Sequence, residues 1–389
     1  MKQIYMDNGA TSFPKAPGVI ESMTYYLQSV GASVNRSAYT SAYASENIVY
    51  ETRELLCQIF DFDNPENMVL TKNVTESLNV LIKGLLKPGD HVLVSSMEHN
   101  AVMRPLNGLN NHKITYTKVP CDSHGGLLVD TIDSLIQKNT KAIIMTHASN
   151  VSGTILPLEK VGRICQENEL LFIIDAAQTA GFMPVSFKKL HADAIAFTGH
   201  KSLLGPQGTG GFMITTPLAE MTSSLMEGGT GSLSYEEIQP RYMPDKFEAG
   251  TPNIPGIYGL HAALSYLIKE DIKTIYEKEM ALTSEFIMGL MNISKIAVIG
   301  IPETKDRTGV ISIDFRNRDN GEAAHLLAKN FGILTRSGLH CAPSAHQTLG
   351  TYPHGTVRFG LSHFMTKHDI HDALYAIHHI STSGGSNGI

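Results

Sequence analysis

Two residues with complementary chemistry stand at the ends of two apolar segments in the middle of the chain. Asp175 ends the apolar run LLFIID, and Lys201 follows a second apolar run, DAIAFT, by way of Gly199 and His200. Parallel strands of an open sheet present their carboxyl ends at one edge, where ligands bind, so we expect the carboxylate and the amine to face one crevice. Taken singly, Asp175 is also compatible with a helix cap, and Lys201 with an ordinary surface lysine.

An acid and a lysine in this arrangement are what pyridoxal phosphate requires of a protein. The lysine holds the cofactor aldehyde as a Schiff base, and the acid keeps the pyridine nitrogen protonated so that the ring withdraws electrons. The chain contains neither a G-x-G-x-x-G nor a G-x-x-x-x-G-K-[ST] motif. Nicotinamide cofactors and nucleoside triphosphates are therefore disfavoured.

The segments that carry these residues predict an α/β fold. Short apolar runs alternate with polar turns and helical patterns, as parallel strands joined by crossover helices do. A helix is expected over 73–86, because Asn73 can cap it and leucines recur at helical spacing. The strands of a mainly parallel seven-stranded sheet are expected at 68–70, 91–95, 113–119, 142–146, 171–175, 194–197 and 211–214.

The pattern changes after about residue 255. A long helical segment over 257–291 precedes expected strands at 310–315, 333–336 and 356–360 and helices at 321–330 and 367–380. This mixture predicts a smaller α+β domain, with the Pro- and Gly-containing stretch 250–256 as the junction. We expect a large domain over 15–255 and a small domain over 256–389, with residues 1–14 packing near the small one.

Composition excludes several classes of protein. A chain of 389 residues with 42% hydrophobic and 17% charged residues is typical of a globular protein. The net charge of −6 and the lack of a basic stripe disfavour nucleic acid as a partner. No run approaches the roughly 18 apolar residues of a membrane span, and no signal peptide is recognisable. We expect a cytoplasmic protein with no membrane partner.

Cysteines and histidines do not form a metal-binding pattern. The four cysteines are too few for a disulfide framework and include no C-x-x-C pair. His368 and His371 share a helix face, but no cysteine or paired carboxylate stands at ligand spacing from them. We therefore expect reduced thiols and no metal site.

Several segments resemble the class V aminotransferase superfamily, in particular its cysteine desulfurase and selenocysteine lyase family. They are IIDAAQTAG, AFTGHKSLLGPQGTGG, FEAGTPN and RSGLHCA, and the similarity runs in the family's order from MDNGATS near the start to TVRFGLSHF near the end. The resemblance implies the type I fold of pyridoxal phosphate enzymes and a homodimer. It also implies release of sulfur or selenium from an amino acid, leaving alanine.

The resemblance assigns roles around the pyridine ring. Lys201 is similar to the Schiff-base lysine, Asp175 to the pyridinium partner, and Gln178 to the residue that hydrogen-bonds the phenolic oxygen. His99 in SSMEHNA resembles the histidine that stacks on the ring and shuttles protons. Without the family, His99 reads equally well as a loop histidine bound to the backbone.

The cofactor phosphate needs hydrogen-bond donors, which free N–H groups at a helix N-terminus supply. Thr75 and the backbone around Val74 open the predicted helix 73–86 and are the first choice, although a plain capping box would use the same N–H groups. Thr198 and His200 resemble further phosphate contacts, and Thr251 resembles the residue that reaches the phosphate of the neighbouring subunit.

The α-carboxylate of an amino acid is matched by a planar guanidinium, which can donate two parallel hydrogen bonds. Arg358 in TVRFG resembles the family's carboxylate-binding arginine, and a surface salt bridge is the alternative for it. Asn150 in THASNVSG resembles the asparagine near both cofactor and substrate. Arg336 completes the expected substrate-binding set.

The type of reaction that we expect depends on the role of Cys341. It lies in the loop RSGLHCAPSAH with His340 beside it and Arg336 upstream, surroundings that favour a thiolate. A loop cysteine by itself is more often inert, but this pattern resembles the active-site cysteine of the short-loop, group II desulfurases, which becomes a persulfide. The chain departs from the family pattern at Leu339 and at 343–346. These departures bear on the choice between L-cysteine and L-selenocysteine and on the sulfur acceptor, a protein or a small thiol.

The expected activity is that of a homodimeric cysteine desulfurase, of the kind that supplies sulfur for iron–sulfur cluster assembly. Three alternatives stay open: a selenocysteine lyase, another class V reaction such as amino-group transfer or epimerisation, and a non-catalytic scaffold that retains the fold.

Overall fold

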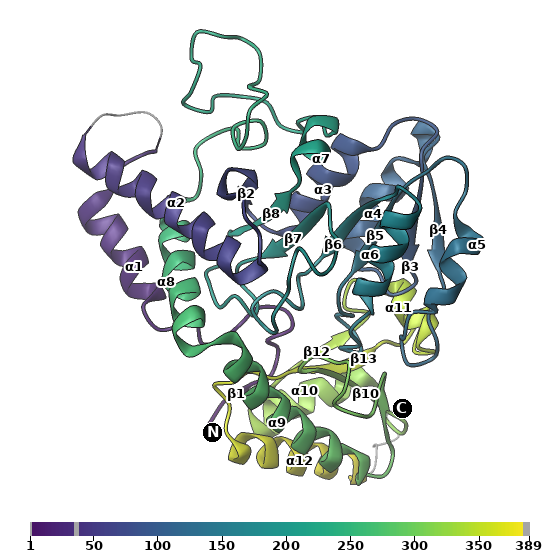
Figure 1. The fold of residues 1–389 in the computed structure, drawn as a ribbon. Helices are drawn as coiled ribbons and strands as arrows, with labels where there is room; N and C mark the ends of the chain where they lie inside the picture. The colour runs from purple at the N-terminus through teal and green to yellow at the C-terminus, as the bar shows by residue number, and fades with distance from the viewer. Residues whose placement is uncertain (1, 35–38, 384–389) are drawn as a thin grey trace.

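The computed structural model describes residues 2–34 and 39–383 of the chain (Figure 1). Its largest sheet has seven strands in the order β2-β8-β7-β6-β5-β3-β4. Strand β8 runs antiparallel to both of its neighbours, and the other neighbouring pairs are parallel. The predicted, mainly parallel seven-stranded sheet is therefore confirmed. The strands are β2 (Met68–Thr71), β3 (His91–Ser95), β4 (Thr115–Val119), β5 (Thr140–Thr146), β6 (Leu171–Asp175), β7 (Ala194–Thr198) and β8 (Gly210–Ile214).

The large sheet is covered on both faces, which is why its strands are apolar almost throughout. Successive residues of β5 enter two separate hydrophobic clusters, Ile143 in one and Ile144 in the other. Helices α3 (Val74–Leu85) and α4 (Asn100–Gly108) supply the cluster that contains Ile144. Helices α2 (Thr40–Phe60), α6 (Leu158–Glu167) and α8 (Ile254–Glu270) supply the other.

The start of α3 follows the sequence prediction. Asn73 caps the helix, because its Oδ1 accepts a hydrogen bond of 3.0 Å from the Glu76 N–H. The Glu76 carboxylate accepts in turn from the Lys72 N–H at 2.7 Å. The first bond satisfies a donor that an α-helix leaves free in its first turn, and the second fixes the residue before the cap.

The long helical segment expected over 257–291 is wrong as a single helix. It consists of α8 and α9 (Ile272–Met291), which meet at Asp271. Asp271 has φ 62°, a left-handed conformation that interrupts a helix, and its carboxylate caps α9 by accepting from the Thr274 N–H at 3.1 Å. The periodicity of the apolar residues continues across this break and concealed it.

A second sheet, antiparallel and four-stranded, lies below the first in Figure 1 and has the order β12-β13-β10-β9. Its strands are β9 (Ile296–Ile299), β10 (Val310–Phe315), β12 (Arg336–Gly338) and β13 (Thr356–Gly360). Helices α9, α10 (Asn320–Phe331) and α12 (Lys367–Thr382) pack against it. The sequence prediction missed β9.

The N-terminal residues join this second region. Strand β1 (Ile4–Tyr5) pairs in parallel with β11 (Ile333–Leu334), so the single strand expected over 333–336 is two short strands, β11 and β12. Helix α8, which begins within the expected junction, packs on α1 (Val19–Tyr25) and α2. The boundary between domains at residue 255 stays a prediction. The other helices are α5 (Ile132–Leu135), α7 (Thr216–Met221) and α11 (Pro343–Thr348).

Residues 2–34 and 39–383 contain no membrane-spanning helix, no metal-binding cluster and no disulfide. Within these ranges, no helix is both long and apolar enough to cross a membrane. In the same ranges, no three His, Cys, Asp or Glu side chains gather as a metal site would require. All four cysteines are free: Cys57 and Cys165 are buried, Cys121 is half-buried and Cys341 is exposed.

Candidate active site

Asp175 lies where the sequence prediction places it, as the last residue of β6. The side chain is buried, and its Oδ1 accepts a 2.9 Å hydrogen bond from the Ala177 N–H. Burial raises the pKa of Asp175, while the Ala177 hydrogen bond and the charge of Lys201 lower it. A positively charged group beside this carboxylate would therefore favour its ionised form.

Lys201 lies in the turn that follows β7, the neighbour of β6. The turn is closed by hydrogen bonds from the Gly205 N–H to the Gly199 carbonyl at 2.8 Å and from the Leu204 N–H to the Lys201 carbonyl at 2.8 Å. Burial lowers the pKa of Lys201 to about 8, against the raising effect of Asp175. An amine with such a pKa is free in an appreciable fraction of molecules near neutral pH, as a nucleophilic lysine must be.

His99 and Gln178 belong to the same edge of the sheet. His99 caps α4, and its Nδ1 accepts a 3.0 Å hydrogen bond from the Ala101 N–H. Burial lowers the pKa of His99 to about 3, helped by the charges of Lys201 and Arg358. The imidazole is therefore neutral and carries its proton on Nε2. The buried Gln178 donates from Nε2 to the carbonyl of Gly9 at 3.2 Å.

Two polar atoms beside Lys201 are buried without a hydrogen-bond partner in the described part of the chain: Thr198 Oγ1 and His200 Nδ1. Burial lowers the pKa of His200 to about 4, so this imidazole is neutral. Since buried polar atoms are nearly always paired, the two atoms indicate room for a polar ligand. At the start of α3, Val74 is buried and Thr75 is exposed. Together these residues fit the phosphate of pyridoxal phosphate.

Thr251 and Lys201 line different cavities of the chain. Thr251 is exposed and lines a cavity of about 350 Å³ with Thr71, Lys72 and Glu76, which precede or begin α3. Lys201 instead lines a small cavity of about 20 Å³ with Glu279 and other residues. The placement of Thr251 is compatible with the expected contact to a neighbouring subunit.

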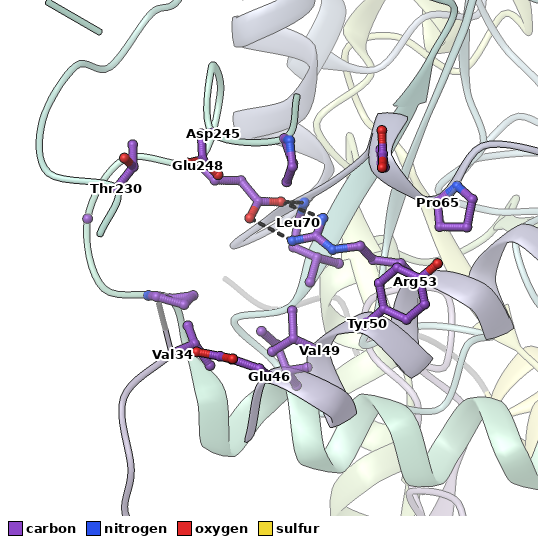
Figure 2. A pocket seen from close by; sticks show the side chains of 15 residues that line it. Val34, Glu46, Val49, Tyr50, Arg53, Pro65, Leu70, Thr230, Asp245 and Glu248 are labelled. Carbon is purple, nitrogen blue, oxygen red and sulfur yellow. Dashed lines mark hydrogen bonds and ion pairs between the residues drawn. The ribbon is translucent and has the colours of Figure 1, made fainter. Parts of the chain in front are cut away.

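A further cavity of about 330 Å³ is lined by an ion pair between the buried Arg53 and the half-buried Glu248, shown in Figure 2. The Glu248 carboxylate accepts from Arg53 Nη1 at 2.9 Å, from Arg53 Nη2 at 2.8 Å and from the Leu70 N–H at 2.7 Å. These bonds tie the segment just before Thr251 to α2 and β2. None of the expected site residues lines this cavity, so we assign the ion pair a structural role.

Arg358, on β13, is buried. Its Nη2 pairs with Asp7 Oδ1 at 2.9 Å, and its Nη1 donates to the Asn150 carbonyl at 3.1 Å. Its Nε has no hydrogen-bond partner among the residues described. The surface salt bridge considered for Arg358 is therefore wrong. Arg336 is exposed and stands opposite Arg358 in the register of β12 and β13.

Cys341 is exposed in a loop that two distant residues hold in place. The His340 carbonyl accepts a 2.7 Å hydrogen bond from Asn150 Nδ2, and the Cys341 carbonyl accepts a 2.8 Å bond from the Asn100 N–H. Since Asn100 follows His99, the loop is joined to the turn that presents His99. His340 and Cys341 have φ 49° and 58°, strained values that only surrounding contacts maintain.

His340 itself is buried and uncharged. Its Nε2 lies 3.1 Å from Thr356 Oγ1, and burial lowers its pKa to about 2, helped by the charge of Arg358. His340 therefore supplies no positive charge beside Cys341.

Two carboxylates at this edge were not predicted. Asp7, which pairs with Arg358, stands in the MDNGATS segment and could have been found there. Glu98 is fully buried and accepts from the Ser95 hydroxyl and from the Thr146 N–H at 3.0 Å. Burial raises the pKa of Glu98 to about 8. Its hydrogen bonds link the end of β3 to the end of β5, next to His99 in the chain.

Comparisons with known proteins agree with this geometry. The family model described as aminotransferase class-V matches residues 4–373. A probable cysteine desulfurase of Methanothermobacter thermautotrophicus is 32% identical over 371 residues, which cover 94% of this chain and 92% of the relative. One from Pyrococcus abyssi is 33% identical over 367 residues, covering 91% of this chain and 88% of the relative.

Solved structures give the same result. The apo structure of a cysteine desulfurase from Thermococcus onnurineus superposes with a TM-score of 0.91 at 30% identity, covering 97% of this chain and 94% of that one. The cysteine desulfurase CsdA from Escherichia coli superposes with a TM-score of 0.86 at 27% identity, covering 96% and 93%. The seven-stranded sheet thus has the type I fold of pyridoxal phosphate enzymes. The chain belongs to the aminotransferase class-V family.

Proposed function

We propose that this protein is a cysteine desulfurase, which uses pyridoxal phosphate to remove sulfur from L-cysteine, releases L-alanine and leaves a persulfide on Cys341. The observation that carries the proposal is the tethering of the Cys341 loop. Asn150 and Asn100 hold it at the edge of the sheet where Asp175 and Lys201 meet. The similarity to proteins named cysteine desulfurase supports this reading over a selenocysteine lyase.

The unpaired atoms of the site determine how the cofactor would be held. Lys201 would bind its aldehyde, and Asp175 would hold a proton on its ring nitrogen. Thr198 Oγ1 and His200 Nδ1 would contact the phosphate together with Thr75 and the backbone of Val74. Gln178 and His99 would flank the ring. When bound, pyridoxal phosphate withdraws electrons from the α-carbon of an amino acid.

The substrate would lie between the two sheets. Among the described residues, Arg358 Nε is without a partner, and Nη1 and Nη2, which each donate once to the Asn150 carbonyl or to Asp7, keep a second N–H each, so donors remain available to the α-carboxylate. Asn150 Oδ1 is also without a partner in the described ranges and would accept from the substrate or the cofactor. Arg336 adds positive charge at the entrance.

Proton transfer and sulfur transfer would fall to different residues. The Lys201 amine takes the α-proton and later returns a proton to carbon. The Cys341 thiolate attacks the substrate sulfur: the S–S bond forms, the C–S bond breaks, and its electron pair stays with the carbon fragment that becomes alanine. Because Cys341 is exposed, a protein or a small thiol can then remove the sulfur.

We also propose that the enzyme is a homodimer of two-domain subunits, large over 15–255 and small over 256–389, and works in the cytoplasm. The loop between α7 and α8 projects from the molecule at the top of Figure 1. It exposes large apolar side chains, among them Tyr235 and Ile238. Thr251 near its end lines a different cavity from Lys201 of the same chain. Free cysteines suit a reducing compartment.

The decisive experiment replaces the thiol and follows product and cofactor separately. Cys341→Ala should abolish formation of alanine from L-cysteine and retain the visible absorbance of bound pyridoxal phosphate. Cys165→Ala, which changes a buried cysteine of α6 in another hydrophobic cluster, should retain turnover. Full turnover of L-cysteine by Cys341→Ala would refute the assignment. Turnover of L-selenocysteine alone by the wild type would favour the lyase.

A further inference from the structure

The N-terminal segment over residues 7–16 contacts three of the residues assigned to the site: Arg358, Gln178 and His200. Asp7 pairs with Arg358, and the Gly9 carbonyl accepts from Gln178. Further along, the segment reaches the turn that carries Lys201, where the Ala16 N–H donates to the Leu204 carbonyl at 3.2 Å. The segment thus contacts the site near its start, at Asp7 and Gly9, and near its end, at Ala16.

Its contacts concentrate on one atom, the carbonyl oxygen of His200. This oxygen lies 2.9 Å from the Ser12 N–H, 3.1 Å from Ser12 Oγ, 3.1 Å from Thr11 Oγ1 and 3.0 Å from Lys15 Nζ. A carbonyl oxygen has two lone pairs, so four donors are more than it needs. Four donors from one segment therefore fix the position of the His200 carbonyl oxygen.

Lys15 organises the cluster. Its ammonium has three N–H donors and three acceptors: the His200 carbonyl, Ser12 Oγ at 3.1 Å and Thr11 Oγ1 at 3.3 Å. Within the described ranges, no carboxylate forms an ion pair with it. Burial without such a partner lowers the pKa of Lys15 to about 8. A half-buried cation that lacks a counter-charge is costly for a fold, so its position calls for a reason.

We infer that Lys15 is a positioning residue for Lys201 and His200, and that it acts by clamping the peptide bond between them. The His200 carbonyl belongs to this peptide bond, so holding the oxygen orients the backbone of Lys201 on one side and the His200 imidazole on the other. Lys15 touches neither the substrate nor the cofactor. The inference rests on the proposed binding of pyridoxal phosphate at Lys201.

The test follows cofactor attachment and does not depend on turnover. Lys15→Met has a similar length and no donor, and Lys87→Met, in the exposed turn before β3, is the matched control. Cofactor-free proteins are mixed with pyridoxal phosphate. The dissociation constant is read from visible absorbance, and the rate of modification of Lys201 from borohydride reduction and peptide mass. A charge-assisted hydrogen bond to a buried group predicts an about 10- to 100-fold weaker affinity and slower attachment in Lys15→Met.

Each result has a separate meaning. A residue that served stability alone would lower the unfolding temperature and leave the attachment rate unchanged; that result, or wild-type affinity and rate in Lys15→Met, overturns the inference. Absence of cofactor binding in the wild type would overturn the proposed function as well. If Lys15→Met does not fold, Ser12→Ala removes one donor to the His200 carbonyl and one acceptor of the Lys15 ammonium, and it keeps the Lys15 side chain. It should slow attachment about 3- to 10-fold, and an unchanged rate would again refute the role.

Discussion

Asn150 links the loop of Cys341 to the large sheet by one hydrogen bond, and removing that bond should slow sulfur transfer. Asn150→Ala deletes the Nδ2 donor that lies 2.7 Å from the His340 carbonyl and leaves this carbonyl buried without that partner. An unpaired buried group of this kind costs about 1–3 kcal/mol. If the loop position needed for sulfur transfer becomes less favourable by this amount, the rate of persulfide formation falls about 5- to 150-fold, because each 1.4 kcal/mol corresponds to a factor of ten.

Asn150 Oδ1 is also expected at the substrate, so a second variant separates the two roles. Asn150→Asp keeps an oxygen at this position but replaces the donor by a second, charged oxygen, and it should therefore be at least as slow as Asn150→Ala. Asn139→Ala is the control, because Asn139 Nδ2 donates to the Gly89 carbonyl at 2.8 Å at the opposite edge of the sheet and is exposed.

The assay measures alanine released from L-cysteine in steady state and the persulfide formed on Cys341 in a single turnover. Cofactor attachment should be retained in all three variants, since Lys201 and Asp175 are unchanged. Wild-type rates of persulfide formation in both Asn150 variants would refute the reasoning. A rate lost in Asn150→Ala but kept in Asn150→Asp would show that the oxygen matters and the tether does not.

Two predictions concern titration. Burial lowers the pKa of Lys201 to about 8, so the rate at which pyridoxal phosphate attaches to the cofactor-free protein should rise with pH around a midpoint near 8. Stopped-flow absorbance measures this rate. A midpoint above 10 would contradict the prediction. The fully buried Glu279 has a pKa raised from 4.5 to about 8, chiefly by burial, so the folded state holds its proton more tightly than the unfolded chain does. Relative to Glu279→Gln, the wild type should therefore lose unfolding free energy as pH rises from 4.5 to 8, on the order of 5 kcal/mol at 1.36 kcal/mol per pKa unit. Urea unfolding at several pH values tests this, and parallel curves for the two proteins would exclude it.

Local sequence was sufficient for the elements that carry the chemistry. The predicted strands at 91–95, 171–175, 310–315 and 356–360 have the bounds observed in β3, β6, β10 and β13. Buried parallel strands are continuous apolar runs, and a polar residue at the end of such a run marks the edge of the sheet. The positions of Asp175 and Lys201 followed from this rule. The break at Asp271 did not, because the apolar periodicity of α8 continues into α9.

Residue types and spacing by themselves determined the chemical inventory of this protein: an acid and a lysine at neighbouring strand ends, a loop cysteine, and a helix N-terminus for an anion. The tertiary structure alone decided how these groups are held and charged. Lys15 and the His200 carbonyl are 185 residues apart in the chain, Asn150 and His340 are 190 apart, and Asp7 and Arg358 are 351 apart. Hydrogen bonds over such separations, and the burial that sets the pKa values of Lys201 and His99, depend on which surfaces the fold brings together, and a local pattern of residues carries no information about that.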